Sequence, residues 1–350
     1  MKKKKYSYFA ASNSYQGFIN YFDKIFSPEI MDRIFILKGG PGTGKSTIMK
    51  RLSNELIEKQ YTVHEIYCSS DPKSLDGVIA EKDNHRVAIL DGTAPHEIDA
   101  IIPGAVDEII NLGDNWDDRW LSGKKEEIKQ LSLEKKNSYQ TGYNYLQIAG
   151  KIEKIIYAVK KSYFDRNEAK IKAESILDAF LERENGEVNI KVISSFGRYG
   201  KYTLSDCCFI DGDVINVYGE DDNVFLFLDV CKNLLINQGV DITLFPSALD
   251  PQKYDAILLN NHGLFVRKSP DGEINADAFS FLPQIEKEKN RVIEEIYRDA
   301  LTEASRWFKI ASDLHMRLEE IYTAAMDFSK NDLVVTKILQ KIENIGENMH

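Results

Sequence analysis

Residues 33–47 read Arg-Ile-Phe-Ile-Leu-Lys-Gly-Gly-Pro-Gly-Thr-Gly-Lys-Ser-Thr, and this stretch sets the expectations for the chain. Its residues 39–46 match the pattern G-x-x-x-x-G-K-[S/T] between an apolar run at 34–37 and a helical pattern at 47–58. Glycines let backbone N–H groups wrap around an anion, and the N-terminus of a helix adds a favourable dipole. The stretch therefore predicts a strand, a phosphate-binding loop and a helix in succession.

The phosphate loop supplies the first candidate site residues. Lys45 is expected to reach the β- and γ-phosphates as a binding and catalytic residue, and the Ser46 hydroxyl is expected to bind Mg²⁺. The alternative is a glycine-rich turn that binds nothing, but the strand and helix around the loop favour a nucleoside-triphosphate site. The expected nucleotide-binding residues are Gly39, Gly40, Pro41, Gly42, Thr43, Gly44, Lys45, Ser46 and Thr47.

A second acidic signal lies downstream of the loop. Four apolar residues, 87–90, are followed by Asp91. An acid at the carboxyl end of a strand beside a phosphate loop can hold Mg²⁺, directly or through water. Asp91 is therefore the second expected metal ligand and a catalytic candidate. Between the two motifs, a strand is expected over 61–67 and a short helix over 72–80, which is the alternation of a parallel α/β sheet.

Composition limits the class of protein. The chain has 350 residues, 43% hydrophobic and 29% charged, which predicts a globular protein large enough for two domains. No apolar run has the ~20 residues of a membrane span, and no signal-peptide core follows the N-terminal lysines, so we expect a cytoplasmic protein without a membrane partner. The net charge of −10 disfavours nucleic acid as a partner. The four cysteines lack metal-ligand spacing and are expected to be reduced thiols.

The sequence repeats itself. Residues 53–80 align without a gap on 232–259 and place Asp71 on Asp250 and Asp76 on Asp255. The pattern is helical from about 105 to 184, with an apolar stripe formed by Tyr145, Ile148, Ile152, Ile155 and Val159. We therefore expect a tandem duplication of an α/β domain with a parallel sheet flanked by helices, each half extended by a helical hairpin. The expected limits are 1–104 and 187–280 for the two cores, and 105–186 and 281–350 for their helical extensions.

The second copy lacks the phosphate-loop chemistry. Residues 217–225 stand where the loop is expected, and they contain three acids and no lysine. Acidic side chains there would repel a phosphate. Lys268 stands where the first copy has Asp91. The second half is thus expected to be a degenerate domain that binds no nucleotide, serving as structure or as a cap on the first site.

With both halves in view, the chain resembles an uncharacterised family of Firmicute-type ATPases with two phosphate-loop domains in one polypeptide. The resemblance covers most of the chain and rests on residues 39–47, on Ser70-Asp71-Pro72 and on Leu-Asp-Gly-Thr-Ala-Pro-His at 90–96. It implies ATP binding and brings no established substrate. Members often keep a phosphate loop in both halves, and this chain departs from that pattern in the second half.

The catalytic base and an arginine finger are less defined. Many related ATPases carry a glutamate after the magnesium aspartate, whereas this chain has Gly92. His96 and Asp71 are candidates for base or substrate contact, although Asp71 before Pro72 is equally suited to start a helix. Arg198, flanked by glycines at 197 and 200, is the candidate arginine finger, with a surface loop residue as the alternative.

Three function classes are compatible with these residues. The first is a Mg²⁺-dependent ATPase or nucleotide-driven switch, the second a kinase for a small molecule or nucleotide, and the third a non-hydrolysing ATP-binding scaffold. ATP is preferred to GTP because the one string that resembles a guanine-reading motif, at 329–332, lies in a helical tail. The expected partners are a nucleoside triphosphate, an unidentified small molecule or protein, and a second copy of the chain.

Overall fold

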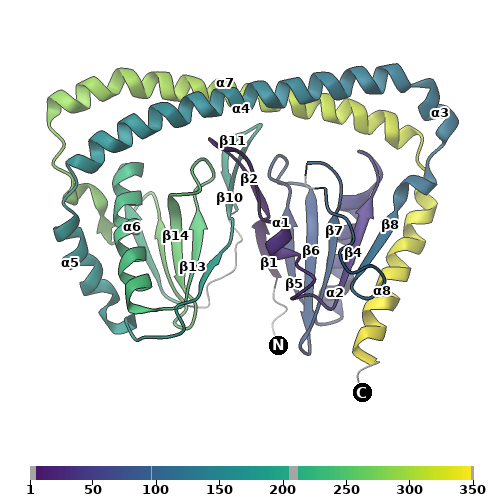
Figure 1. The fold of residues 1–350 in the computed structure, drawn as a ribbon, viewed down its shortest axis with the longest axis horizontal. Helices are drawn as coiled ribbons and strands as arrows, with labels where there is room; N and C mark the ends of the chain where they lie inside the picture. The colour runs from purple at the N-terminus through teal and green to yellow at the C-terminus, as the bar shows by residue number, and fades with distance from the viewer. Residues whose placement is uncertain (1–4, 96, 205–211, 348–350) are drawn as a thin grey trace.

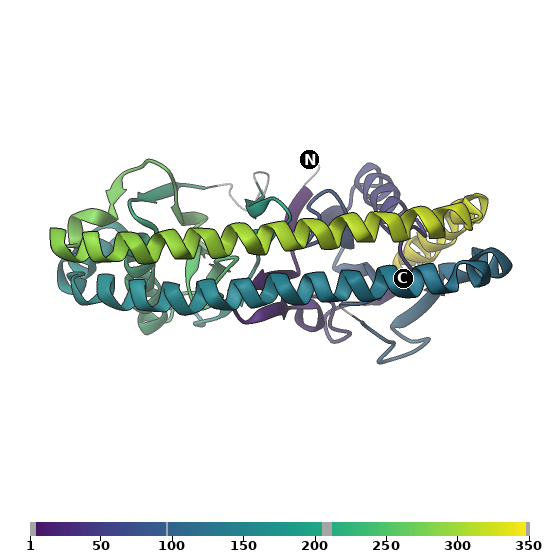
Figure 2. The ribbon, with the colours of Figure 1, turned by 90° about the horizontal axis from the view of Figure 1, so that it is seen from above.

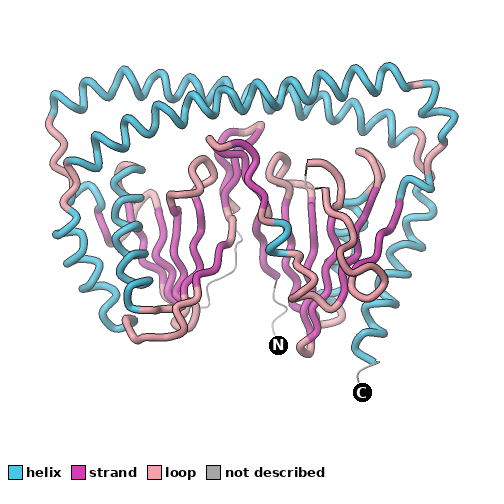
Figure 3. The backbone as a smooth tube through the Cα atoms, in the orientation of Figure 1, coloured by secondary structure: helices cyan, strands magenta, loops and turns pink. Residues whose placement is uncertain are grey.

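The computed structural model describes residues 5–95, 97–204 and 212–347. It has two similar α/β halves, and a pair of long antiparallel helices lies across the same end of both (Figure 1). Each half contains a six-stranded mixed sheet and a two-stranded hairpin. The strands of both sheets end in loops on the side that faces the helix pair (Figure 3).

The first sheet has the order β1-β5-β6-β7-β4-β8. Strand β6 runs antiparallel to both of its neighbours, and the other neighbouring pairs are parallel. The bounds are β1 (Lys5–Phe9), β4 (Arg33–Lys38), β5 (Thr62–Tyr67), β6 (Leu75–Lys82), β7 (His85–Asp91) and β8 (Asp107–Asn111). The expectation of a parallel sheet was therefore wrong for β6.

Two segments expected to be helical are strands. The predicted helix at 72–80 is mostly β6, in which every residue from Leu75 to Ala80 is buried. A short apolar run does not by itself distinguish a strand from a helix, and burial on both faces removes the alternation that would reveal a strand. The predicted helical region after residue 105 begins instead with β8, where buried and exposed residues alternate in part.

The second sheet repeats the first. Read from β9, its order is β9-β13-β14-β15-β12-β16, which corresponds strand by strand to β1-β5-β6-β7-β4-β8 of the first sheet. The parallel and antiparallel neighbours are also the same, with β14 in the place of β6. The bounds are β9 (Val188–Ile190), β12 (Val214–Tyr218), β13 (Ile242–Pro246), β14 (Tyr254–Leu259), β15 (Leu264–Lys268) and β16 (Ile274–Asn275). The two hairpins are β2 (Ala11–Ser14) with β3 (Gly17–Asn20), and β10 (Ser194–Gly197) with β11 (Gly200–Thr203).

Some helices pack on the sheet of their own half, and others cross to the opposite half. Helices α2 (Lys45–Glu58) and α6 (Asp221–Gln238) pack on their own sheets, whereas α4 (Lys125–Ser162) and α7 (Gln284–Ala324) cross from one half to the other (Figures 1 and 2). After the crossings, α5 (Arg166–Leu177) joins the second core and α8 (Asn331–Glu347) joins the first. The shorter helices are α1 (Phe22–Ile25), α3 (Asp118–Gly123) and the 3₁₀ turns Leu112–Asn115, Asp178–Phe180, Ala276–Phe279 and Phe328–Lys330.

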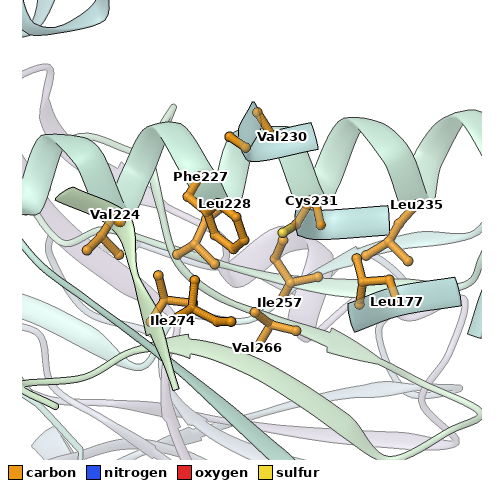
Figure 4. Packing of buried hydrophobic residues seen from close by; sticks show 14 of the residues in the cluster. Leu177, Val224, Phe227, Leu228, Val230, Cys231, Leu235, Ile257, Val266 and Ile274 are labelled. Atoms are coloured by element: carbon orange, nitrogen blue, oxygen red, sulfur yellow. The ribbon is translucent and has the colours of Figure 1, made fainter. Parts of the chain in front are cut away.

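Each core thus contains side chains from distant parts of the sequence. In the second core, Leu177 of α5 lies near Cys231 and Leu235 of α6 above the sheet residue Ile257 (Figure 4). In the first core, α8 contributes Val335, Ile338 and Ile342. The segment 105–186, expected to extend the first half, therefore includes a helix of the second core.

The face of α4 that packs differs from the predicted stripe. Ile148 and Ile155 are 46% and 55% exposed, so the stripe is not a buried seam. The buried positions are Leu131, Ser138, Gly142, Leu146, Ala149, Gly150, Glu153, Ile156 and Lys160. Small residues among them permit close approach; a Cβ on Gly142, for example, would lie 2.8 Å from the Phe308 ring of α7. In the described part of the chain, no helix has the length and apolarity to cross a membrane.

Phe308→Ala tests the junction of the halves. Phe308 is 2% exposed, and its ring packs on Tyr139 and Tyr143 of α4 and on Phe196 of β10. Truncation should reduce the free energy of unfolding by about 3–5 kcal/mol, measured by chemical denaturation. The matched control is Phe281→Ala, because Phe281 is 63% exposed and its loss should change stability by no more than about 0.5 kcal/mol. Equal effects of the two substitutions would contradict this packing.

Candidate functional site

Residues 39–46, here called the glycine-rich loop, follow β4 and include the first two residues of α2. Gly42 and Gly44 have φ angles of 71° and 86°, in the left-handed region that other residues rarely adopt. Gly44 is also the residue at which α2 begins, so the N–H groups of the first turn point toward the loop. The sequence pattern therefore produces the expected strand, loop and helix, with glycines where the backbone requires them.

Lys45 and Asp91 meet at this loop. The Lys45 Nζ donates hydrogen bonds to the carbonyl oxygens of Gly39 (2.7 Å) and Gly40 (2.9 Å) and lies 3.6 Å from Asp91 Oδ2. Asp91 pairs with Leu37 across β4 and β7, so the strand register brings the acid to the end of the strand that carries the loop. The structure thus places one cation and one carboxylate together at the glycine-rich loop.

The two candidate metal ligands have defined partners. Asp91 Oδ1 accepts hydrogen bonds from the Thr93 backbone N–H (2.9 Å) and hydroxyl (2.6 Å). The Ser46 hydroxyl oxygen accepts one from the Leu75 N–H (2.9 Å) at the start of β6. In the part of the chain that the structure describes, no group of three His, Cys, Asp or Glu side chains is arranged around a metal position. A Mg²⁺ ion here would need oxygens from a phosphate and from water, as this ion usually has.

Asp76 is a further candidate in this region that the chemical motifs did not identify. It is the unpaired residue of an irregularity between β5 and β6, since Ile66 pairs with Gly77 and Tyr67 with Leu75. A bulge of this kind re-aims a side chain. Asp255, its aligned partner in the repeat, occupies the same irregularity between β13 and β14. The duplication was thus the one signal in the sequence that could have singled Asp76 out.

The two aspartates at this position have different surroundings. Asp255 accepts a hydrogen bond from Ser194 Oγ and forms an ion pair with Lys201, with distances of 3.0 Å in each case. Asp76 is 6% exposed, and burial raises its pKa to about 8, assisted by the nearby charge of Asp91 and opposed by Cys68 and Lys45. At pH 7 the Asp76 carboxyl is therefore mostly protonated. A carboxyl group with so perturbed a pKa beside a phosphate-loop-like turn is a functional-site candidate.

The end of α7 closes over the glycine-rich loop. A Cβ on Gly42 would lie 2.6 Å from the backbone oxygen of Glu319 and 2.7 Å from Thr323 Oγ1. Beyond α7, the Asn331 side chain at the start of α8 donates a hydrogen bond to the Thr43 carbonyl oxygen (3.2 Å). The loop is therefore in contact with the last part of the chain, which arrives from the second half. The sequence did not predict this contact, because the crossing helices were expected to form separate hairpins.

Three titratable side chains of the long helices also belong to this region. Lys135 of α4 lies 3.4 Å, Nζ to Nδ1, from His315 of α7, and His315 Nε2 lies 3.6 Å from Glu319 Oε1. Burial lowers the pKa of His315 to about 4, and the charges of Lys135 and Lys45 add to this effect. Burial raises the pKa of Glu319, with a further contribution from Asp71. The imidazole is therefore neutral at pH 7 and can accept a hydrogen bond from Lys135.

The remaining residues proposed from the sequence are Asp71, Arg198 and His96. The Asp71 carboxylate accepts a hydrogen bond from the Lys73 N–H (3.1 Å), which is a turn-capping contact. Arg198, in the β10–β11 turn, donates to Ser312 Oγ (2.7 Å) and lies 3.7 Å from Asp313 Oδ1, both on α7. It lines a small cavity together with Ser70, near Asp71. His96 lies outside the described residues. Roles for Asp71, His96 and Arg198 stay predictions.

The counterpart region of the second half is filled with charges of its own. The Asp277 carboxylate accepts hydrogen bonds from the Glu220 N–H and the Asn223 side chain, both 2.8 Å, at the start of α6. Lys268, at the end of β15, lies 2.5 Å from Asp221. A cavity of about 300 Å³ remains between α6 and the long helices, and its lining includes Tyr15, Glu153, Lys160, Asp222, Lys253 and Glu294.

Asp76→Asn tests the environment of Asp76 through stability. The folded-state pKa of Asp76 is raised to about 8, so the folded protein holds this proton while the unfolded chain loses it above about pH 4. The wild type should therefore lose stability at this group as pH rises from 4 to 8, whereas the asparagine variant should not. The free energies of unfolding of the two proteins, measured by chemical denaturation, should therefore diverge with pH by on the order of 1 kcal/mol per pH unit in favour of the variant. Asp118→Asn, at an exposed position, is the control; parallel profiles for Asp76→Asn and wild type would exclude the assignment.

Comparison with known proteins gives one family signal. A family model described as "Novel STAND NTPase 3" matches residues 21–93, which include β4, the glycine-rich loop, α2 and the strand ending at Asp91. No curated protein and no solved structure matches the chain. The match suggests an NTPase-type domain in the first half, at the segment where the structure brings Lys45 and Asp91 together.

Proposed function

We propose that the first half binds ATP with Mg²⁺ at the glycine-rich loop and that the protein is a Mg²⁺-dependent ATPase or nucleotide-driven switch. The observation that carries the proposal is the meeting of Lys45, Asp91 and the α2 N-terminus around glycines with left-handed backbone angles. The NTPase family match over residues 21–93 supports the same segment. Membership of the tandem-domain ATPase family is part of this proposal.

Each residue of the loop would have a separate task. The backbone N–H groups and the start of α2 would hold the phosphates, and the Lys45 ammonium would exchange its two carbonyl partners for phosphate oxygens. Ser46 and Asp91 would hold Mg²⁺, which neutralises charge on the phosphate oxygens when it is bound. Protonated Asp76 would keep a second negative charge away from Asp91 until a cation arrives.

The structure favours the ATPase or switch over the kinase alternative. A kinase needs an acceptor site beside the phosphates, and Asp71, the candidate for substrate contact, instead accepts a turn-capping hydrogen bond from the Lys73 N–H. A switch instead needs an element that contacts both the nucleotide site and a distant part of the protein. Helix α7 meets this requirement, because its last turns contact Gly42 and its Ala304 packs in one hydrophobic cluster with Leu249 of the second half. The scaffold alternative shares the binding site and differs only in turnover.

Lys45→Ala should weaken ATP binding by about 100-fold or more, because it removes the cation of the loop and leaves the phosphates without a charged partner. Isothermal titration calorimetry with MgATP measures the loss. Lys50→Ala is the matched control, since Lys50 is an exposed lysine of the same helix and should leave the affinity unchanged. An Lys45→Ala protein that binds ATP as the wild type does would refute the site.

A single nucleotide per chain is expected from the charges of the second half. The Asp277 carboxylate already accepts an N–H at the start of α6, and Glu220, Asp221 and Asp222 form the N-cap and first turn of this helix. A bound phosphate would face repulsion there. Calorimetric titration of the wild type should saturate at one ATP, and two equivalent sites would show that the second half is also a nucleotide site.

A further inference from the structure

The long helix α4 carries one buried or half-buried lysine toward each half, and the two lysines differ in their partners. At the end over the second half, the Lys160 Nζ lies 3.1 Å from Glu220, 3.4 Å from Asp222 and 3.5 Å from Glu294. At the end over the first half, the Lys135 Nζ has no carboxylate within 4.0 Å among the described residues. Its polar contact is with the neutral ring of His315, 3.4 Å from Nζ to Nδ1.

The groups that face Lys135 come from several elements. From α7, His315 supplies a ring nitrogen, and Glu319 lies one helical turn further along, where its backbone touches the glycine-rich loop. From below, the charges of Lys45, Asp71 and Asp91 are close enough to act on His315. Burial lowers the pKa of Lys135 while Glu319 raises it, so this ammonium lies in a partly desolvated position with little compensation. Lys135 thus belongs to the group of α4 and α7 side chains that lie over the glycine-rich loop and Asp91.

An ammonium group that is taken from water needs a negative partner, since its burial costs free energy unless it is paired. Lys160 shows how a buried lysine is paired where no ligand is expected. Three carboxylates of the same chain lie within 3.5 Å of its Nζ. In the first half, the acid that acts on Lys135 is Glu319, and its carboxylate lies more than 4.0 Å from the Lys135 Nζ. Lys135 therefore lacks a close negative partner, and a triphosphate bound at the glycine-rich loop would supply one.

We propose that Lys135 is the cation of the second wall of the nucleotide site and contacts the terminal phosphate of the bound triphosphate from above. The proposal rests on the proposed function of the glycine-rich loop. In this arrangement Lys45 holds the phosphates from the loop, and Lys135 holds the outermost phosphate from α4. His315 keeps the Lys135 ammonium in place, and Arg198 remains bound to Ser312 and Asp313.

The contact predicts a selective effect on nucleotides that differ by one phosphate. Lys135→Ala should weaken binding of a non-hydrolysable Mg²⁺–ATP analogue by about 10-fold, as expected for loss of one charge-assisted hydrogen bond, and should leave MgADP within about two-fold. Calorimetry with both ligands gives the ratio directly and does not depend on turnover. Lys135→Arg should restore most of the preference for the triphosphate, because the charge is kept.

Two further variants keep the test decisive. Lys136→Ala removes the neighbouring exposed lysine of α4 and should change neither affinity, which excludes a general effect of surface charge. Lys135→Met retains the apolar stem and repeats the measurement if the alanine variant folds poorly. Equal losses for both nucleotides, no loss for either, or the same loss in Lys136→Ala would overturn the proposal. A wild type that binds neither nucleotide would overturn the proposed function itself, which is a separate result.

Discussion

The antiparallel contact between α4 and α7 is the constraint on which the rest of the structure depends. The segments that flank these helices are joined by matching backbone hydrogen bonds: Asp117 N–H to Ala325 O over the first half and Asp165 N–H to Phe279 O over the second, both 2.8 Å. Because the helices are about 57 Å and about 62 Å long, one pair covers both sheets. Each crossing then delivers a further helix, α5 or α8, to the opposite core. The first sheet therefore needs α8, from the part of the chain after residue 186, and the second sheet needs α5, from the part before it.

This exchange has a consequence for the candidate site. The strand, loop and first helix are local in sequence, whereas the residues above the loop belong to α4, α7 and α8. A change at Gly42 would be transmitted first to Glu319 and Thr323, with which it is in direct contact. Helix α7 is continuous from there to Ala304, which packs in one hydrophobic cluster with Ala248 and Leu249 of the second half. A rigid helix of this kind gives a physical route between the two ends of the molecule.

Sequence reasoning was successful where the signal is local. The order of strand, glycine-rich loop and helix, and the position of Asp91 beside Lys45, follow from motif spacing and strand register. It failed at β6, where burial on both faces conceals the strand period, and at α4, where Gly142 and Gly150 pack more closely than the larger Ile148 and Ile155. The proximity of Lys135, His315 and Glu319 could not be predicted, because it depends on which helix crosses to which half.

The duplication makes the differences between the halves informative. Asp76 and Asp255 occupy the same bulge, yet Asp255 is paired with Lys201 while burial keeps Asp76 mostly protonated. Lys268 replaces Asp91, and Asp277 holds the start of α6. In the second half, charges are balanced by side chains of the chain itself, which stabilises one arrangement. In the first half, a carboxyl group remains raised in pKa, a lysine faces a neutral histidine, and a loop ammonium is bonded mainly to backbone oxygens. That imbalance costs stability in the free protein, and it is the arrangement expected of a site whose electrostatic partner is supplied by a ligand.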